Sequence, residues 1–221
     1  MRTHTKEFQQ NLTPQTAFEV LKEGNQRFVN NLKLNRNLLD QVEETAGGQF
    51  PFAAVLSCMD SRTSVEHIFD QGLGEIFSLR VAGAVVNEDI IGSLEYACKV
   101  AGSKLVVVLG HSRCGAIKGA VDNVRLGNLS ALLDKVQPAL EKTSAARNEV
   151  NHETYVELVS HANVHNSLQE ILNGSEILRK MYEDGQIGLV GGSYSVENGK
   201  VNFLETMFAS KVRQPEVEEV G

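Results

Sequence analysis

Short apolar runs of strand length alternate along this chain with segments of helical periodicity, and this alternation restricts the fold more than any other feature. Residues 52–57 and 76–81 have the character of strands, and residues 105–109 (LVVVL) are apolar throughout. A strand with no polar side is buried on both faces, as in parallel sheets whose crossovers are helices. The sequence therefore predicts an α/β fold, with a central and mostly parallel β-sheet flanked by helices.

Helices are predicted between and after these strands. They occupy residues 64–70, 89–100, a segment that begins near Gly115, 129–140, 155–172 and 176–182. A further strand at 187–190 is followed by Asn198-Gly199, a dipeptide typical of tight hairpin turns, and by an apolar run at 201–204. We therefore expect the sheet to end in an antiparallel hairpin strand.

The two ends of the chain lie outside the alternating pattern. Residues 1–46 are expected to form an N-terminal helical arm, in which Thr13 is an N-cap and Pro14 takes the first helical position. Because this arm has few apolar residues, we expect it to pack on the core or on a second subunit. Residues 214–221 carry three glutamates and are expected to fray. No linker divides the chain, so a single domain over 1–221 is expected.

The charge balance limits the classes of partner. The formal net charge is −7, from 21 Lys and Arg against 28 Asp and Glu, which argues against binding to nucleic acid or to an anionic membrane. No apolar run approaches the ~20 residues of a membrane helix, and the first residues do not form an apolar secretory segment. Three cysteines suit a reducing compartment, so we expect a cytoplasmic protein whose thiols are free to act as ligands or nucleophiles.

Two motifs of reactive side chains follow predicted strands. The motif CMDSR at 58–62 comes directly after the first core strand, and the motif HSRCG at 111–115 comes directly after the LVVVL strand. In parallel α/β sheets, ligands bind outside the carboxyl ends of the strands. We therefore expect both motifs at the same edge of the sheet, close enough to form one site.

The side chains of these motifs suit a zinc ion. Two thiolates (Cys58 and Cys114), the imidazole of His111 and the carboxylate of Asp60 are all ligands that tetrahedral zinc accepts. Two thiolates already neutralise Zn²⁺. If Asp60 pairs with Arg62 through a two-pronged hydrogen bond, the fourth position opens to water, whose pKa zinc lowers to about 7. If Asp60 binds the metal instead, the site is closed.

These residues also allow other interpretations. Each motif alone is weak, and a buried structural cysteine is the usual fate of one Cys, an interpretation that we favour for Cys98. His161 and His165 are four residues apart on a predicted helix, where a partly exposed helix face is favoured over a metal site. Cys114 and His111 could also form a nucleophilic pair, although their short offset suits shared metal ligation better.

With these motifs, the sequence resembles the β-class carbonic anhydrases over most of its length. The resemblance implies zinc held by Cys58, His111 and Cys114, with an Asp60–Arg62 pair that holds the catalytic water or releases Asp60 onto zinc in a closed, inactive state. It also implies reversible hydration of CO₂ to bicarbonate and a proton, and a homodimer or homotetramer.

The resemblance further implies a substrate pocket. Gln49, Phe77 and Tyr96 stand at the pocket positions of the plant-like branch, whose zinc site is open, and Ala82 is expected beside them. The chain has no tryptophan, the residue that the closed-site bacterial branch uses in its inhibitory pocket, so an open site is expected at neutral pH. Ala84 stands where many members have an asparagine, so that hydrogen bond is lost. The pocket residues could act within one subunit or across a subunit boundary.

Two alternatives to CO₂ hydration stay open. The same scaffold could hydrolyse CS₂ or COS, which a narrow, long tunnel would favour. The protein could instead be a non-catalytic regulator that binds zinc. The presence of Asp60, Arg62 and Gln49, which structural zinc does not need, argues against the regulator.

Overall fold

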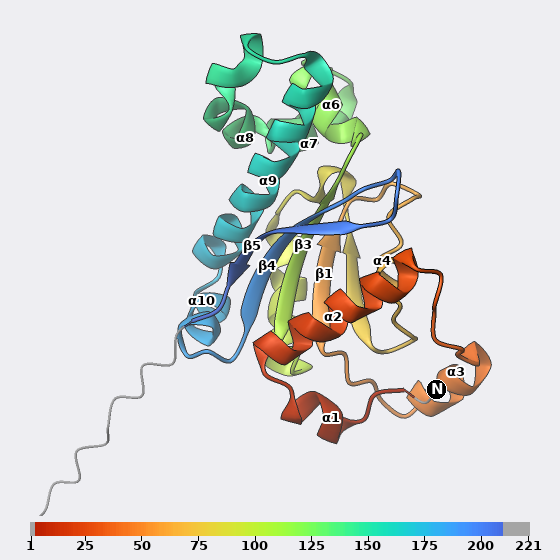
Figure 1. Cartoon of the computed structure of the whole chain (residues 1–221). Coiled ribbons are helices and arrows are strands. Elements are labelled where there is room, and N and C mark those ends of the chain that lie inside the picture. The colour runs from red at the N-terminus through yellow and green to blue at the C-terminus, as the bar shows by residue number, and fades with distance from the viewer. Residues whose placement is uncertain (1–2, 210–221) are drawn as a thin grey trace, which may run out of the picture.

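A five-stranded sheet with the strand order β2-β1-β3-β4-β5 forms the centre of the computed structural model, which describes residues 3–209 (Figure 1). Its strands are β1 (Ala53–Ser57), β2 (Ile76–Arg80), β3 (Leu105–His111), β4 (Gly188–Tyr194) and β5 (Val201–Met207). The first four are parallel, and β5 pairs with β4 in the antiparallel sense. The predicted α/β fold and its C-terminal hairpin strand are confirmed, while the predicted fraying at 214–221 falls outside the described residues.

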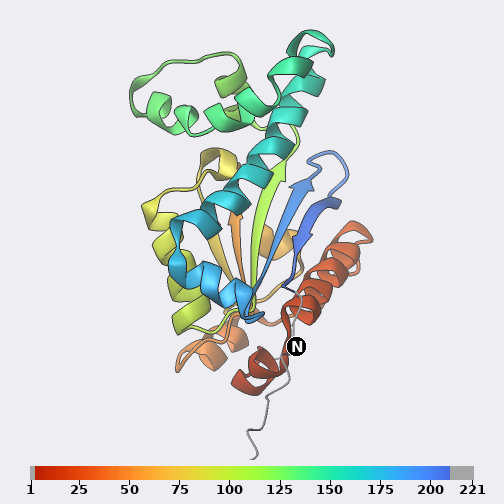
Figure 2. The same ribbon diagram turned by 90° about the vertical axis from the view of Figure 1, so that its left-hand side faces the viewer.

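Helices cover both faces of the sheet (Figure 2). One face is covered by α2 (Pro14–Val29) and α4 (Val65–Ile68), and the other by α5 (Glu88–Glu95), α9 (His152–Gly174) and α10 (Glu176–Glu183). Successive β1 residues therefore point into different cores: Val55 packs beneath α2, and Leu56 packs beneath α9. Both are fully buried. Each such side chain contributes about 1.5–3 kcal/mol, which explains why the central strands are apolar throughout.

The remaining helices lie at the ends of the sheet. In the arm are α1 (Lys6–Asn11) and α3 (Leu38–Thr45), and above the carboxyl ends of the strands are α6 (Gly115–Val121), α7 (Gly127–Asp134) and α8 (Gln137–Lys142) (Figure 1). The predicted helix at 129–140 is two helices, because Pro138 takes the first turn of α8 rather than a helix interior. The predicted helix at 89–100 is α5 continued by a π-helical turn, η2 (Tyr96–Val100). Within residues 3–209, none of these helices combines the length and apolar character needed to span a bilayer.

The N-terminal arm packs on the core of its own chain. Thr13 caps α2 through a hydrogen bond from the Thr16 amide, as predicted from the sequence. Ala17 and Leu21 are fully buried against the sheet. A Cβ atom at Gly24 would lie 1.8 Å from the carbonyl oxygen of Phe69, so glycine is required where α2 meets the end of α4.

A buried ion cluster joins the arm to the loop after α4. The Asp70 carboxylate, 3% exposed, accepts hydrogen bonds from Arg27 Nε at 2.6 Å, from Arg36 Nη1 at 2.7 Å and from the Leu34 amide at 3.2 Å. The Arg36 side chain is only 8% exposed. Arg36 also faces the buried Glu75 carboxylate at 3.6 Å, but its direct hydrogen bonds are to Asp70, so removing the Asp70 charge leaves a buried cation poorly compensated.

We therefore predict that Asp70→Asn lowers the free energy of unfolding by about 3 kcal/mol. The backbone of residue 70 has φ 47°, and asparagine adopts this left-handed conformation as readily as aspartate, so the effect isolates the charge. Urea denaturation followed by circular dichroism measures it. Asp122→Asn, which removes the exposed partner of Lys118 and His152, is the control and should leave the midpoint nearly unchanged. Equal losses in the two variants would contradict the prediction.

Candidate metal centre

The strand order places a crevice between β1 and β3. The chain passes from β1 to β2 on one side and later returns to β3 on the other, and ligands bind where the connections diverge in this way. Ser57, the last residue of β1, lies opposite Leu109 of β3. Cys58 follows β1, and His111 is the last residue of β3. The two motifs therefore meet at the carboxyl end of the sheet, as predicted from the sequence.

Three side chains form a compact cluster there. Cys58, His111 and Cys114 are 5%, 0% and 2% exposed, and their ligand atoms all lie within 4.8 Å of one another. The two Sγ atoms are 3.9 Å apart and the thiols are free. Tetrahedral zinc with Zn–S bonds of 2.3 Å requires an S···S separation of about 3.8 Å. The cysteine pair therefore has the spacing of metal ligands rather than that of a disulfide.

His111 presents an unused nitrogen to this cluster. Its Nδ1 lies 2.9 Å from the carbonyl oxygen of Ser112, a contact in which Nδ1–H donates when the ring is neutral. Its Nε2 is buried without a hydrogen-bond partner among the described residues. Buried polar atoms are almost always paired, so an orphaned nitrogen beside two thiols indicates a metal ligand. The donor set fits a zinc ion.

The two thiols share their proton unequally. The pKa of Cys58 is lowered to about 4, chiefly because Cys114 donates a hydrogen bond to its sulfur, an effect larger than the opposing effect of burial. The same contact and burial raise the pKa of Cys114. Without metal, the pair holds one thiolate and one thiol. A divalent cation would displace the remaining proton and replace the S–H···S contact.

Asp60 is held away from the cluster by Arg62. The guanidinium donates from Nε to Oδ1 at 2.9 Å and from Nη2 to Oδ2 at 2.8 Å, and the Arg62 amide also donates to Oδ1 at 3.0 Å. The hydrogen bonds from Arg62 hold the pKa of Asp60 well below its usual range, so the carboxylate is ionised at neutral pH. In residues 3–209, the metal-ligand group consists of the cysteines and the histidine without Asp60. This arrangement is the open one of the two that the sequence left possible.

The residues that hold this loop were not identified from the sequence. Arg80 donates from Nη2 to the Asp60 carbonyl at 2.5 Å and from Nε to the Cys58 carbonyl at 3.3 Å. Thr63 Oγ1 lies 2.8 Å from each of the same two carbonyl oxygens. Arg80 is the last residue of β2 and stands opposite Ser57, so its position at a strand end was the signal available in the sequence.

A strained turn, η1 (Ala82–Ala84), closes one side of the cluster. The Gly83 amide donates to Cys58 Sγ at 3.4 Å, which places the predicted pocket residue Ala82 beside the metal ligands. Gly83 and Ala84 both have positive φ, at 71° and 51°. The left-handed conformation costs a residue with a Cβ about 1–2 kcal/mol. The loss of the hydrogen bond that an asparagine at position 84 would make stays a prediction.

The other predicted pocket residues do not reach the cysteine pair within one chain. Phe77 stands three residues before the end of β2, about 10 Å from the carboxyl end of the sheet where the cysteine pair lies. Its ring centroid is 6.2 Å from that of Tyr96, which is 55% exposed. Gln49 precedes β1 at the opposite end of the sheet, with its Cβ beside Gly74. Their role in binding substrate stays a prediction.

The histidines of α9 and the third cysteine lie apart from the cluster. His161 is 3.5 Å from Glu157, and His165 Nδ1 donates to the Glu205 carboxylate at 2.7 Å. Both histidine side chains are more than a third exposed. Cys98 is buried, and burial raises the pKa of its thiol to about 12. These positions fit the helix-face and core-thiol interpretations.

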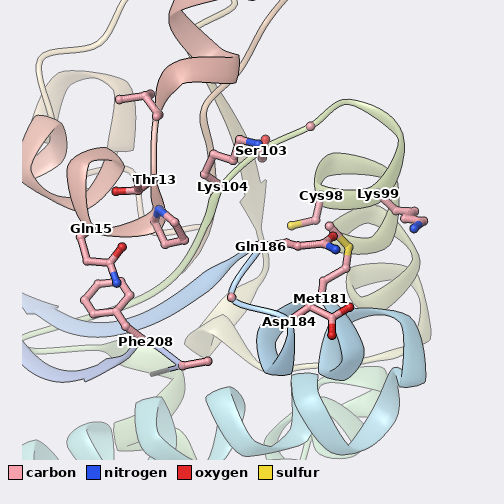
Figure 3. Close-up of a pocket in the computed structure, with 15 residues that line it drawn as sticks. Thr13, Gln15, Cys98, Lys99, Ser103, Lys104, Met181, Asp184, Gln186 and Phe208 are labelled. Carbon is pink, nitrogen blue, oxygen red and sulfur yellow. The ribbon is translucent and has the colours of Figure 1, made fainter. Parts of the chain in front are cut away.

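A cavity of about 950 Å³ lies at the amino ends of the strands, away from the cluster. Figure 3 shows its polar lining, which includes Lys99, Lys104 and Asp184, together with Phe208 and the sulfur of Cys98. In the part of the chain that the structure describes, the cysteine–histidine cluster is the one group able to hold a metal ion. Although this cavity is large, the candidate metal centre lies elsewhere.

Comparisons with known proteins agree with this geometry. A sequence model of the family described as "Carbonic anhydrase" matches residues 53–201. Carbonic anhydrase 2 of Mycobacterium tuberculosis is 33% identical over 196 residues, which cover 86% of this chain and 92% of that protein. The fold is similar to that of the β-carbonic anhydrase of Coccomyxa, with a TM-score of 0.70, 25% identity and coverage of 76% and 78% of the two chains.

The β-carbonic anhydrase CafA of Aspergillus fumigatus is also similar, with a TM-score of 0.69, 26% identity and coverage of 76% of this chain and 81% of that chain. The sequence match, the fold and the site agree. This chain belongs to the carbonic anhydrase family, in its β class.

We predict that the purified protein carries about one zinc ion per chain, because three ligand atoms are already gathered in one buried cluster. Cys58→Ala and Cys114→Ala should each lose most of the metal, measured by mass spectrometry of the element after gel filtration. Cys98→Ala removes an equally buried thiol that is not part of the cluster and should keep its zinc. Retention of zinc by both cluster variants would refute this assignment.

Proposed function

We propose that the protein catalyses the reversible hydration of CO₂ to bicarbonate and a proton, with zinc held by the two sulfur atoms of Cys58 and Cys114 and by Nε2 of His111. The observation that carries the proposal is a set of three ligands with the neighbouring carboxylate tied to Arg62. Catalytic zinc sites use three protein ligands and keep one position open. Zinc in such a site supplies a Lewis acid that makes water nucleophilic near neutral pH.

Asp60 would orient the attacking water. An ionised carboxylate offers about four acceptor positions, and three of them are taken by hydrogen bonds from Arg62. One position on Oδ2 is left to accept a hydrogen bond from the water and so direct its lone pair toward CO₂. Arg62 fixes the carboxylate in place and keeps it ionised, so that it acts as an acceptor and does not take the position of the substrate water.

The apolar side of the pocket would come from two subunits. Ala82 stands beside the metal ligands of its own chain, whereas Gln49, Phe77 and Tyr96 lie on or beside β2, the strand at one edge of the sheet that residues 3–209 form. Large apolar side chains are exposed along this region: Leu38 (54%), Leu39 (80%), Val42 (54%), Leu73 (41%) and Val100 (70%). Such a surface favours association. We propose a homodimer, or a homotetramer built from it, in which these residues complete the partner's site.

The two ligand thiols indicate that the protein works in a reducing compartment. The cluster needs both sulfur atoms as thiolates, and the 3.9 Å between them is short enough that a modest shift would allow a disulfide. Oxidation would remove two of the three ligands. The protein is therefore expected to work in the cytoplasm, where thiols are kept reduced.

Asp60→Asn should lower kcat for CO₂ hydration by about 100-fold or more while the zinc content stays at the wild-type level. The amide keeps the shape of the carboxylate but loses its charge and one acceptor oxygen. Stopped-flow measurement with a pH indicator tests this, with Asp134→Asn on the surface as a matched control that should keep the wild-type rate. A wild-type protein that binds zinc but hydrates no CO₂ at any pH would refute the proposal and support a non-catalytic role.

Mixed dimers can decide where Gln49 acts. Cys58→Ser and Gln49→Ala should each be inactive or nearly so when assembled alone. If Gln49 serves the partner's site, co-expression gives mixed dimers with one intact site each, and the preparation regains about one quarter of the wild-type rate. If Gln49 serves its own chain, both sites of every mixed dimer are defective and no activity returns. Differently tagged chains allow the mixed species to be isolated and assayed.

A further inference from the structure

The turn that donates to Cys58 is held from the opposite side by helix α9. Asn163 Nδ2 donates to the Gly83 carbonyl at 2.9 Å, and Ser167 Oγ donates to the Ala84 carbonyl at 3.3 Å. Asn163 and Ser167 are 4% and 2% exposed and lie one helical turn apart on α9. Two consecutive residues in left-handed conformation therefore have both of their carbonyl groups anchored by buried side chains of one helix.

This anchoring compensates for a turn that its own residues do not favour. A Cβ at Gly83 would make only ordinary contacts of 3.5 Å or more, so the conformation, rather than a lack of space, requires glycine there. Ala84 adopts a φ of 51° in spite of its methyl group. Such conformations persist only where the surroundings determine them, and they occur often at functional sites. The turn has one hydrogen bond of its own, from the Ala84 amide to the Val81 carbonyl at 2.9 Å, and the two hydrogen bonds from α9 fix its carbonyl groups in addition.

The consequence reaches the metal ligand through a short chain of contacts. Asn163 fixes the carbonyl group of Gly83. The backbone amide of Gly83 in turn donates to Cys58 Sγ at 3.4 Å. A hydrogen bond to a thiolate orients the sulfur and offsets part of its charge, which matters where two thiolates share a buried site. The sulfur of Cys58 is thereby held in one direction relative to Cys114 and His111.

We propose that Asn163 is a positioning residue for the metal centre, which acts through the Gly83 amide to hold the Cys58 thiolate ready to bind zinc. The inference rests on the proposed zinc site. Asn163 does not touch the substrate or the metal. Its removal is therefore expected to change how tightly zinc is held more than it changes the chemistry of the zinc that remains.

Release of zinc from the holoenzyme tests this proposal. Holoenzyme is mixed with excess of a chromophoric zinc chelator, and the rate of zinc transfer is followed by absorbance. Asn163→Ala should release zinc about 10-fold faster than the wild type, since outer contacts of this kind change metal affinity by about 10- to 100-fold. The cobalt-substituted variant should also show a shifted thiolate-to-cobalt charge-transfer band, because the sulfur has lost its hydrogen bond.

Two further variants separate positioning from general destabilisation. Asn166 is 6% exposed on the same helix, and its side-chain oxygen accepts a hydrogen bond from Lys142 rather than from the turn, so Asn166→Ala should release zinc within about twofold of the wild-type rate. Ala84→Gly removes the methyl group that opposes the left-handed conformation. Combined with Asn163→Ala, it should return part of the lost zinc retention.

The outcomes are distinct. Wild-type release rates in Asn163→Ala, or equally fast release from Asn166→Ala, would overturn the positioning role while leaving the proposed function intact. A wild-type protein without zinc would overturn both. A wild-type protein that holds zinc tightly yet hydrates no CO₂ would overturn the proposed reaction alone, because zinc retention is measured without the assay of activity.

Discussion

The approach of two buried thiols and one imidazole is the interaction on which the rest of this structure depends. Bringing Cys58 and Cys114 to 3.9 Å inside the protein leaves a shared proton between them, and Nε2 of the adjacent His111 has no hydrogen-bond partner in the part of the chain that the structure describes. Such an arrangement is unfavourable for a core built only for stability, since buried polar atoms without partners cost free energy. A cation that accepts all three ligand atoms removes this cost, which is why the cluster is best understood as a metal centre.

The surrounding structure positions the ligands of this cluster in three successive ways. The sheet supplies position, since the carboxyl ends of β1 and β3 lie side by side. Arg80 and Thr63 hold the backbone of the first motif through the carbonyl groups of Cys58 and Asp60. Arg62 then keeps the Asp60 carboxylate ionised and away from the sulfur atoms. Each of these restricts the next, so the site is defined by hydrogen bonds to backbone groups as much as by its ligands.

Much of this could be predicted from the sequence, because the relevant signals are local. The uniformly apolar strand at 105–109 required a sheet covered on both faces, and the two motifs at strand ends then had to share an edge. The hairpin at Asn198-Gly199 also followed from local chemistry. The order of the strands is not local, and neither is the contact between Asn163 and Gly83, which are 80 residues apart. The left-handed conformation of Ala84 could not be predicted, because the residues next to it in the sequence do not indicate a positive φ. The contacts that hold this conformation come from a helix far away in the sequence.

The separation of Gln49 and Phe77 from the metal ligands of their own chain affects how the protein can change over time. In the proposed dimer, a substitution on the outer face of β2 leaves the fold and the zinc of its own subunit intact, yet it alters turnover at the active site of the partner subunit. Selection on catalysis would then act on a surface that, in a single chain, looks like an ordinary solvent-exposed strand edge. The subunit interface and the catalytic activity would have to evolve together, because a substitution in the interface also changes the rate of the reaction.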